Sequence, residues 1–247
     1  MKKRNWYLAI GLALLAGSAV LYGIDYGIFG DAHHLYIYLL GDLAFLPLEV
    51  LVVTVIVDRL LSERDKRMTL EKLNMVIGAF YSAVGTELLR DLVDIDPSSD
   101  PKRKDLMVDA GWTEKEFRAM KHEFAAEQFK CDSRTADLAA LKELLVSNRD
   151  FFIRLLENPM LLEHVTFTDL LWAVSHLSEE LESRASLEGL AEADMDHLAG
   201  DMSRAYKLLA IQWLDYMLHL RANYPYLFSL AMRLNPFDSD ARAEITG

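Results

Sequence analysis

An all-α fold is predicted for this chain of 247 residues: a two-helix transmembrane hairpin followed by a cytosolic helical-bundle domain. Three observations lead to that prediction. The N-terminal part holds two long apolar stretches, basic residues flank the pair, and apolar residues beyond them recur at helical spacing. No segment alternates like a β-strand over a useful length. The expected organisation is a hairpin at 1–61, a juxtamembrane stalk helix at 62–95 and the cytosolic helical domain at 96–247.

The two spans are expected at about 6–24 and 35–57. The first stretch has no charged side chain, and the second is interrupted only by Asp42 and Glu49. At a rise of 1.5 Å per residue, a helix of either length is about as long as a hydrocarbon core about 30 Å thick.

The distribution of basic residues sets the orientation. A basic cluster, Lys2, Lys3 and Arg4, precedes the first span, further Lys and Arg follow the second from Arg59 on, and the loop at 25–34 contains neither type. The positive-inside rule therefore places both termini in the cytoplasm, with the hairpin crossing the cell (inner) membrane. An alternative is that the first stretch is a cleavable signal peptide with its small-residue site at 16–18. The main domain faces inward on either interpretation.

Asp42 and Glu49 are the candidate functional residues of the second span. They are spaced by two helical turns and share one face, which Tyr38 extends outward. Carboxyl groups inside a membrane are costly and usually face a bundle interior or water. In an oligomer, this face of Tyr38, Asp42 and Glu49 would line a cation or proton pathway. The alternative is structural, with Asp42 at the outer interface and Glu49 neutral and hydrogen-bonded between helices.

Small residues of the first span are candidates for close helix packing. Ala13 and Gly17, and Gly23 and Gly27, have the small-xxx-small spacing that lets two helices approach. This spacing fits packing against the second span as well as self-association.

Helices of the cytosolic domain are expected near 113–129, 134–157, 166–186 and 194–222, after a loop at 96–101. Thr113 with Glu116 has the capping-box spacing, and Thr166 with Asp169 is a further candidate start. An apolar stripe at helical spacing joins the stalk to the domain: Leu73, Ile77, Phe80, Val84 and Leu88. The tail at 224–237 is expected to form a short amphipathic helix that caps the bundle core or lies on the inner leaflet.

Composition excludes several functions. Beyond residue 57 the chain has 23 basic and 34 acidic residues, so nucleic acid is not an expected partner. The single cysteine, Cys131, is expected to be a buried apolar side chain. No Glu-x-x-His pair of the di-iron kind is present; the nearest patterns are Asp194-x-x-His197, His176-x-x-Glu179 and Asp215-x-x-x-His219. No catalytic residue, metal ligand or cofactor is therefore predicted.

The expected function is that of a two-span, homo-oligomeric membrane protein that anchors a cytosolic helical ligand- or partner-binding domain. Its expected partners are the lipid bilayer, other copies of itself, and a cytosolic protein or small ligand. The alternatives are a small cation or proton channel that uses the Asp42–Glu49 face and, third, a membrane-tethered metalloenzyme. An enzyme is the less favoured class because no catalytic motif is present.

Overall fold

The structure is a computed structural model that describes residues 2–161 and 164–244. Every regular element within those ranges is helical, which confirms the predicted all-α class. By its internal contacts the chain divides into two compact units, Met1–Lys66 and Arg67–Gly247.

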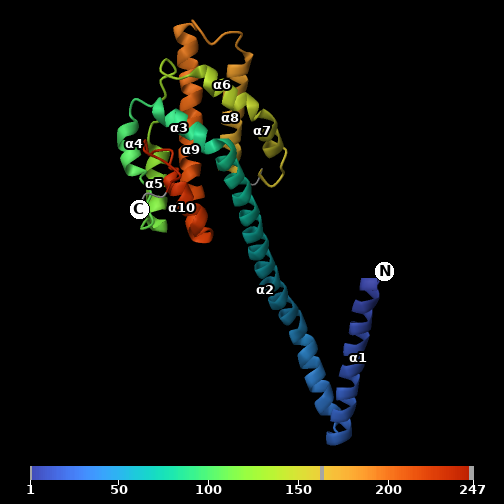
Figure 1. The fold of residues 1–247 in the computed structure, drawn as a ribbon. Coiled ribbons are helices and arrows are strands. Elements are labelled where there is room, and N and C mark those ends of the chain that lie inside the picture. Colours follow the sequence, from blue (N-terminus) through green and yellow to red (C-terminus); the bar gives the residue numbers. More distant parts are fainter. Residues whose placement is uncertain (1, 162–163, 245–247) are drawn as a thin grey trace. The chain divides into compact units, whose positions relative to one another are not determined.

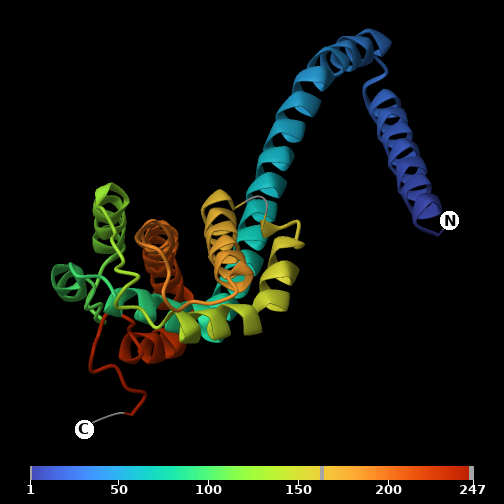
Figure 2. The same cartoon turned by 90° about the horizontal axis from the view of Figure 1, so that it is seen from above.

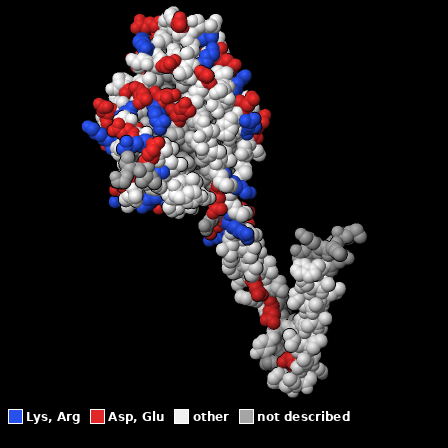
Figure 3. Space-filling model, in the orientation of Figure 1, with Lys and Arg blue, Asp and Glu red and all other residues white. Residues whose placement is uncertain are grey.

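The N-terminal unit contains α1 (Lys2–Phe29) and the first part of α2 (Ala32–Phe80). Gly30 joins the two helices with a φ of 63°, a left-handed conformation that glycine adopts without steric cost. Both helices are long and apolar enough to cross a membrane, with apolar stretches that begin at Ala9 and Leu35. On the face that Figure 3 shows, the described residues of this unit include few charged side chains, whereas Lys, Arg, Asp and Glu are spread over the C-terminal unit.

The C-terminal unit contains the end of α2, a π-helical turn and eight further described helices. These elements are η1 (Tyr81–Gly85), α3 (Thr86–Asp94), α4 (Ser99–Asp105), α5 (Glu114–Ala126), α6 (Leu138–Ser147), α7 (Arg149–Leu156), α8 (Val165–Ser183), α9 (Glu192–Asn223) and α10 (Pro225–Arg233). The long helix α9 is central and contacts α3, α5, α8 and α10 (Figures 1 and 2).

The apolar stripe of the stalk packs inside this unit. Its five side chains are all buried, from Leu73 to Leu88. The Phe80 ring lies edge-on to Phe167 of α8, with 5.5 Å between ring centroids. The predicted stalk 62–95 therefore consists of the end of α2, η1 and α3, and it contributes buried side chains to the domain core from Leu73 on.

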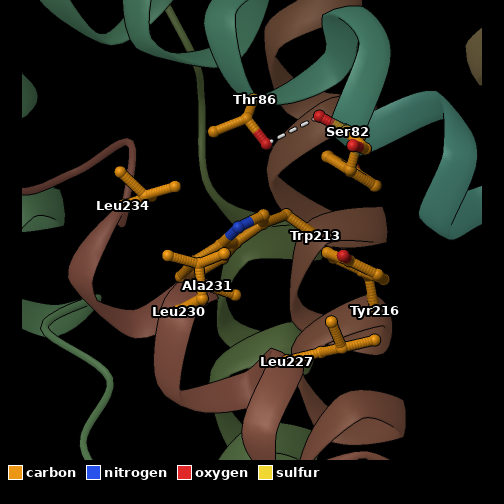
Figure 4. Close-up of a pocket in the computed structure, with 9 residues that line it drawn as sticks. Ser82, Thr86, Trp213, Tyr216, Leu227, Leu230, Ala231 and Leu234 are labelled. Carbon is orange, nitrogen blue, oxygen red and sulfur yellow. Dashed lines mark hydrogen bonds between the residues drawn. The ribbon is translucent and has the colours of Figure 1, made fainter. Parts of the chain in front are cut away.

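The π-helical turn η1 widens the helix beside a small cavity. The Tyr81 hydroxyl donates to the Leu209 carbonyl oxygen at 2.7 Å, and the Thr86 hydroxyl donates to the Tyr81 carbonyl oxygen at 2.9 Å. Side chains from η1, α3, α9 and α10 surround a cavity of about 220 Å³ (Figure 4). Trp213 and the leucines of α10 make most of its wall apolar, and Ser82 and Thr86 lie at its η1 end.

We expect Gly85→Ala to destabilise the protein by about 1–3 kcal/mol, the usual cost of overpacking a well-packed core. A Cβ at this position would lie 2.6 Å from Cε1 of the Phe80 ring, which is itself fully buried and has no room to shift. Urea unfolding of the detergent-solubilised full chain measures the effect. The matched control is Gly78→Ala, whose Cβ would meet Tyr216 at an ordinary 3.5 Å. It should be neutral or stabilising by up to about 1 kcal/mol, and equal effects of the two variants would contradict the steric account.

Three local predictions are wrong and one is confirmed. The loop expected at 96–101 ends at Ser99, where the unpredicted helix α4 begins. The single helix expected at 134–157 is two helices, α6 and α7, because the chain leaves the helix at Asn148, whose side-chain amide donates to the Leu144 carbonyl oxygen at 2.9 Å. α8 begins after His164, whose ring Nδ1 accepts from the Phe167 backbone, and not at a Thr166–Asp169 cap. The Thr113–Glu116 capping box is present at the start of α5.

The C-terminal tail forms α10, which begins at a proline in its first turn. Phe228 and Phe237 are buried, and the Phe237 ring lies 5.5 Å from that of Trp213. These contacts favour the expectation that the tail caps the bundle core.

Candidate metal centre

Two packed helices of the C-terminal unit each present a histidine and a carboxylate. His176 and Glu180 lie on α8, and His197 and Asp201 lie on α9. Both pairs have i,i+4 spacing, which places the two side chains of each pair on the same helix face. Because α8 and α9 run side by side (Figure 1), the four side chains meet in one cluster.

The distances within this cluster suit a bound transition-metal ion. One ligand atom from each of the four residues lies within 4.8 Å of all the others. The Nε2 atoms of His176 and His197 are 3.3 and 3.4 Å from Asp201 Oδ2, and they are 3.8 and 3.5 Å from the nearer Glu180 oxygen. Ligands about 2.0–2.1 Å from a tetrahedral zinc ion are separated from one another by about 3.3–3.4 Å. The side chains therefore need only small shifts to surround an ion.

A buried carboxylate oxygen lies at the centre of the cluster. Asp201 is only 3% exposed, and its Oδ2 atom is buried without a hydrogen-bond partner among the described residues. The two imidazole nitrogens are close to it but outside hydrogen-bonding geometry. A buried oxygen of this kind is costly unless it gains a partner, and a cation held between Asp201 and the two histidines would be that partner.

Arginines fix both carboxylates from outside the cluster. Arg204 Nη1 lies 2.9 Å from Asp201 Oδ1, the oxygen opposite the histidines. Arg184 Nη1 lies 2.9 Å from Glu180 Oε2, and its other end binds Asp194 at 2.6 Å. The Arg184 hydrogen bond holds the pKa of the Glu180 carboxyl below its usual value. Outer partners that orient ligand carboxylates are typical of metal sites.

The ligand types indicate which ion would fit. Imidazole with carboxylate oxygen is a donor set that suits zinc and neighbouring divalent transition metals. If all four side chains bound one ion, they would complete a tetrahedral shell, which is the closed kind of zinc site. The side chains of His176 and His197 are 44% and 53% exposed, so an ion can enter from solvent.

The four-residue cluster is not predicted from the sequence because the pattern sought there is Glu-x-x-His. The signal is instead a histidine followed four residues later by a carboxylate, and it occurs on two consecutive helices of one domain. Of the patterns noted from sequence, Asp194 binds Arg184, Asp215 pairs with Lys121, and His219 contacts Asn223. The side chain of His176 is half-exposed.

The candidate residues of the two spans lie in the N-terminal unit. Asp42 and Glu49 are exposed on α2, which continues through Pro47, and Tyr38 is exposed on the same helix. Ala13, Gly17, Gly23 and Gly27 are exposed on α1. A Cβ built on any of these three glycines would meet nothing within 4 Å, so self-association through them stays a prediction.

Cys131 is buried, as expected for an apolar cysteine. Burial raises the pKa of its thiol to about 12, so it is a protonated thiol at neutral pH. Reactive cysteines have a lowered thiol pKa instead.

The fold and this cluster define an all-α protein with an apolar two-helix N-terminal unit and a helical domain that carries two histidines and two carboxylates at metal-ligand distances. The chain belongs to the MJ1433 family. Residues 69–233 match the family model described as "Uncharacterized protein MJ1433, C-terminal helical domain", which covers the cluster, and residues 2–61 match "MJ1433, N-terminal helical domain".

A relative from Methanocaldococcus jannaschii, "Uncharacterized protein MJ1433", is 44% identical over 239 residues, which cover 97% of this chain and 96% of the relative. No solved structure matches the chain.

Proposed function

We propose that this chain is a membrane-anchored protein whose cytosolic helical domain binds a divalent transition-metal ion, zinc by ligand type, through His176, Glu180, His197 and Asp201. The ligand of the ligand-binding domain expected from sequence is then a metal ion. The observation that carries the proposal is the convergence of one ligand atom from each residue within 4.8 Å. With all four positions filled by protein, the ion joins α8 to α9 and has a binding or structural role.

A zinc titration of the metal-stripped full chain in detergent tests this proposal. A chromogenic zinc chelator serves as the competitor, and elemental analysis gives the stoichiometry. We expect one ion per chain and a loss of affinity of about 100-fold or more in His176→Ala and in His197→Ala, because each removes a direct ligand. Arg204→Met removes the hydrogen bond to Asp201 Oδ1 and no direct ligand, so it should weaken zinc binding by about 10–100-fold.

The matched control is His122→Ala on α5, which removes an exposed histidine outside the cluster. It should bind zinc like the wild type. If His122→Ala and His176→Ala bind equally, or if the wild type binds less than one ion per two chains, the cluster is an ion-pair network and the proposal fails.

The membrane part of the proposal rests on the two apolar helices and on the distribution of basic residues. The apolar stretches of α1 and α2 are long enough to span a membrane. The basic residues before the first stretch and after the second favour an orientation in the cell membrane with both termini in the cytoplasm. Extraction of cell membranes with alkaline carbonate is a direct check. The protein should stay in the membrane pellet, and release into the supernatant would remove this part of the proposal.

Channel activity is a second candidate, carried by the exposure of two carboxyls in an otherwise apolar stretch. Asp42 and Glu49 have no ion-pair partner among the described residues, and oligomers formed through Gly17 and Gly27 would place these carboxyls around an axis. Liposomes with wild-type protein should then pass cations or protons, and the Asp42→Asn/Glu49→Gln variant should not. Equal flux through both, or none through either, assigns the two acids a structural role.

A further inference from the structure

The cavity beside the π-helical turn η1 has a buried polar group in its wall that the fold leaves unpaired. Trp213 of α9 lines this cavity and is only 2% exposed. A buried indole N–H usually finds a hydrogen-bond partner. Trp213 Nε1 makes no hydrogen bond within the part of the chain that the structure describes, so its proton is free to bind another molecule.

The indole nitrogen is accessible from the cavity. The polar side-chain atoms that are fully enclosed without a partner among the described residues belong to other residues, such as Tyr206 and Arg233. Trp213 Nε1 is not one of these enclosed atoms although it also lacks a partner, so it keeps contact with open space. Figure 4 shows the indole in the middle of the lining residues, with its nitrogen on the edge nearer to Thr86. A molecule in the cavity can therefore reach this donor.

The rest of the wall suits an apolar, uncharged molecule. The described residues that line the cavity include no charged side chain, so an ion placed there would lose hydration without gaining a charged partner. Leu227 and Leu230 of α10 are 40% and 38% exposed, and they make the rim on that side apolar as well. The ring of Tyr216 forms a flat wall, because it stacks on Tyr81 with 5.0 Å between ring centroids.

Size and the neighbouring helix turn narrow the ligand further. The cavity measures about 220 Å³, and an apolar protein cavity of about 150 Å³ holds benzene, so the ligand is a single ring or a short chain. π turns within α-helices occur frequently at functional sites. In η1 the Tyr81 carbonyl oxygen accepts both the backbone N–H and the hydroxyl of Thr86. The Thr86 hydroxyl proton is therefore already used, whereas the indole proton of Trp213 is not.

We propose that this cavity binds a small neutral molecule, a single ring or a short chain, whose carbonyl-type oxygen accepts a hydrogen bond from Trp213 Nε1. The rest of the ligand packs against the apolar walls from α9 and α10. None of the four residues of the metal cluster lines this cavity, so the proposal does not depend on metal binding.

The indole N–H signals of the full chain in detergent test this proposal. The chain has four tryptophans, so selective ¹⁵N-tryptophan labelling gives at most four indole signals, and Trp213→Phe identifies the one from Trp213. Cyclohexanone should move this signal downfield in a saturable way, with a dissociation constant on the order of 1 mM. Methylenecyclohexane has the same shape without the oxygen and should cause no downfield movement. Cyclohexanecarboxylate, an anion, should not bind.

Three results of this titration would overturn the proposal. The first is a Trp213 signal that cyclohexanone does not move. The second is an equal movement of all the indole signals, which would be an effect of the solvent and not of a site. The third is a larger movement with cyclohexanecarboxylate than with cyclohexanone, which would show that the site prefers an anion.

Ala231→Leu separates binding in the cavity from binding elsewhere. Ala231 lines the cavity from α10, so a larger side chain there fills the space while Trp213 remains as the reporter. We expect the affinity for cyclohexanone to fall by about tenfold or more, and the melting temperature to equal or exceed that of the wild type, because the new side chain occupies empty space.

The matched control is Ala222→Leu, at an exposed position of α9 outside the cavity. It should bind cyclohexanone like the wild type. If Ala231→Leu also keeps the wild-type affinity, cyclohexanone does not occupy the cavity and the proposal is wrong.

Discussion

Lys102→Met is expected to destabilise the C-terminal domain by about 3–5 kcal/mol, the usual cost of removing one partner of a buried ion pair. Lys102 and Asp96 are 1% and 3% exposed, and Lys102 Nζ lies 2.9 Å from Asp96 Oδ2. Nζ also lies 3.0 Å from Ser98 Oγ and 5.2 Å from the centroid of the Phe129 ring. Methionine keeps the volume of the lysine stem, so the loss comes from leaving the Asp96 charge buried without its partner.

Urea unfolding of the full chain in detergent measures this effect, with two variants as controls. Arg118→Met breaks an ion pair between Arg118 and Glu114, whose side chains are 74% and 60% exposed respectively. Exposed pairs of this kind contribute at most about 0.5 kcal/mol. The double variant Lys102→Met/Asp96→Asn should regain part of the loss because it no longer buries a charge. If Lys102→Met costs as little as Arg118→Met, the pair is solvated in solution and does not hold α4 in place.

Zinc is expected to stabilise the wild-type domain against unfolding by about 2.7 kcal/mol when the free ion is at 100 times its dissociation constant. The ion binds ligands on α8 and α9, which come together only in the folded state. A chelator should therefore lower the unfolding midpoint of the wild type. It should have no effect on His176→Ala or His197→Ala, which have already lost the site.

In His122→Ala, whose missing histidine lies outside the cluster, zinc should raise the free energy of unfolding as much as it does in the wild type. Zinc that stabilises His176→Ala as much as the wild type would place the bound ion elsewhere on the protein. Zinc that destabilises the wild type would show preferential binding to the unfolded chain.

The fold class is predictable from sequence because its signal is carried by many residues at once. The stripe from Leu73 to Leu88 requires a helix that buries one face, and the structure buries all five of its side chains. Local chemistry is equally reliable at Thr113, where side chain and backbone bond within one turn. Helix type and approximate position follow from such short-range information.

Features that depend on one residue's tertiary surroundings are not predictable in this way. Asn148 interrupts a continuous apolar pattern between α6 and α7, and η1 inserts a π turn into a stretch that reads as α-helix. Lys102 reads as one of several exposed charges in its segment, and only packing against Asp96 and Phe129 shows that it is buried.

Only part of the metal cluster can be predicted from the sequence. The sequence shows that His176 and Glu180, and likewise His197 and Asp201, are four residues apart. Each pair alone would be an ordinary ion pair on one helix. What sequence does not contain is the register of α8 against α9, which brings the two pairs within ligand distance. The burial of Asp201, which sets this cluster apart from surface charge, also depends on that register.

X-ray absorption spectroscopy of the zinc-loaded full chain tests the metal centre most directly. The account predicts a first shell of two imidazole nitrogens and two carboxylate oxygens at about 2.0–2.1 Å, with the imidazole contribution lost in the His176→Ala/His197→Ala variant. A sulfur ligand at about 2.3 Å, or a spectrum that this variant leaves unchanged, would contradict it.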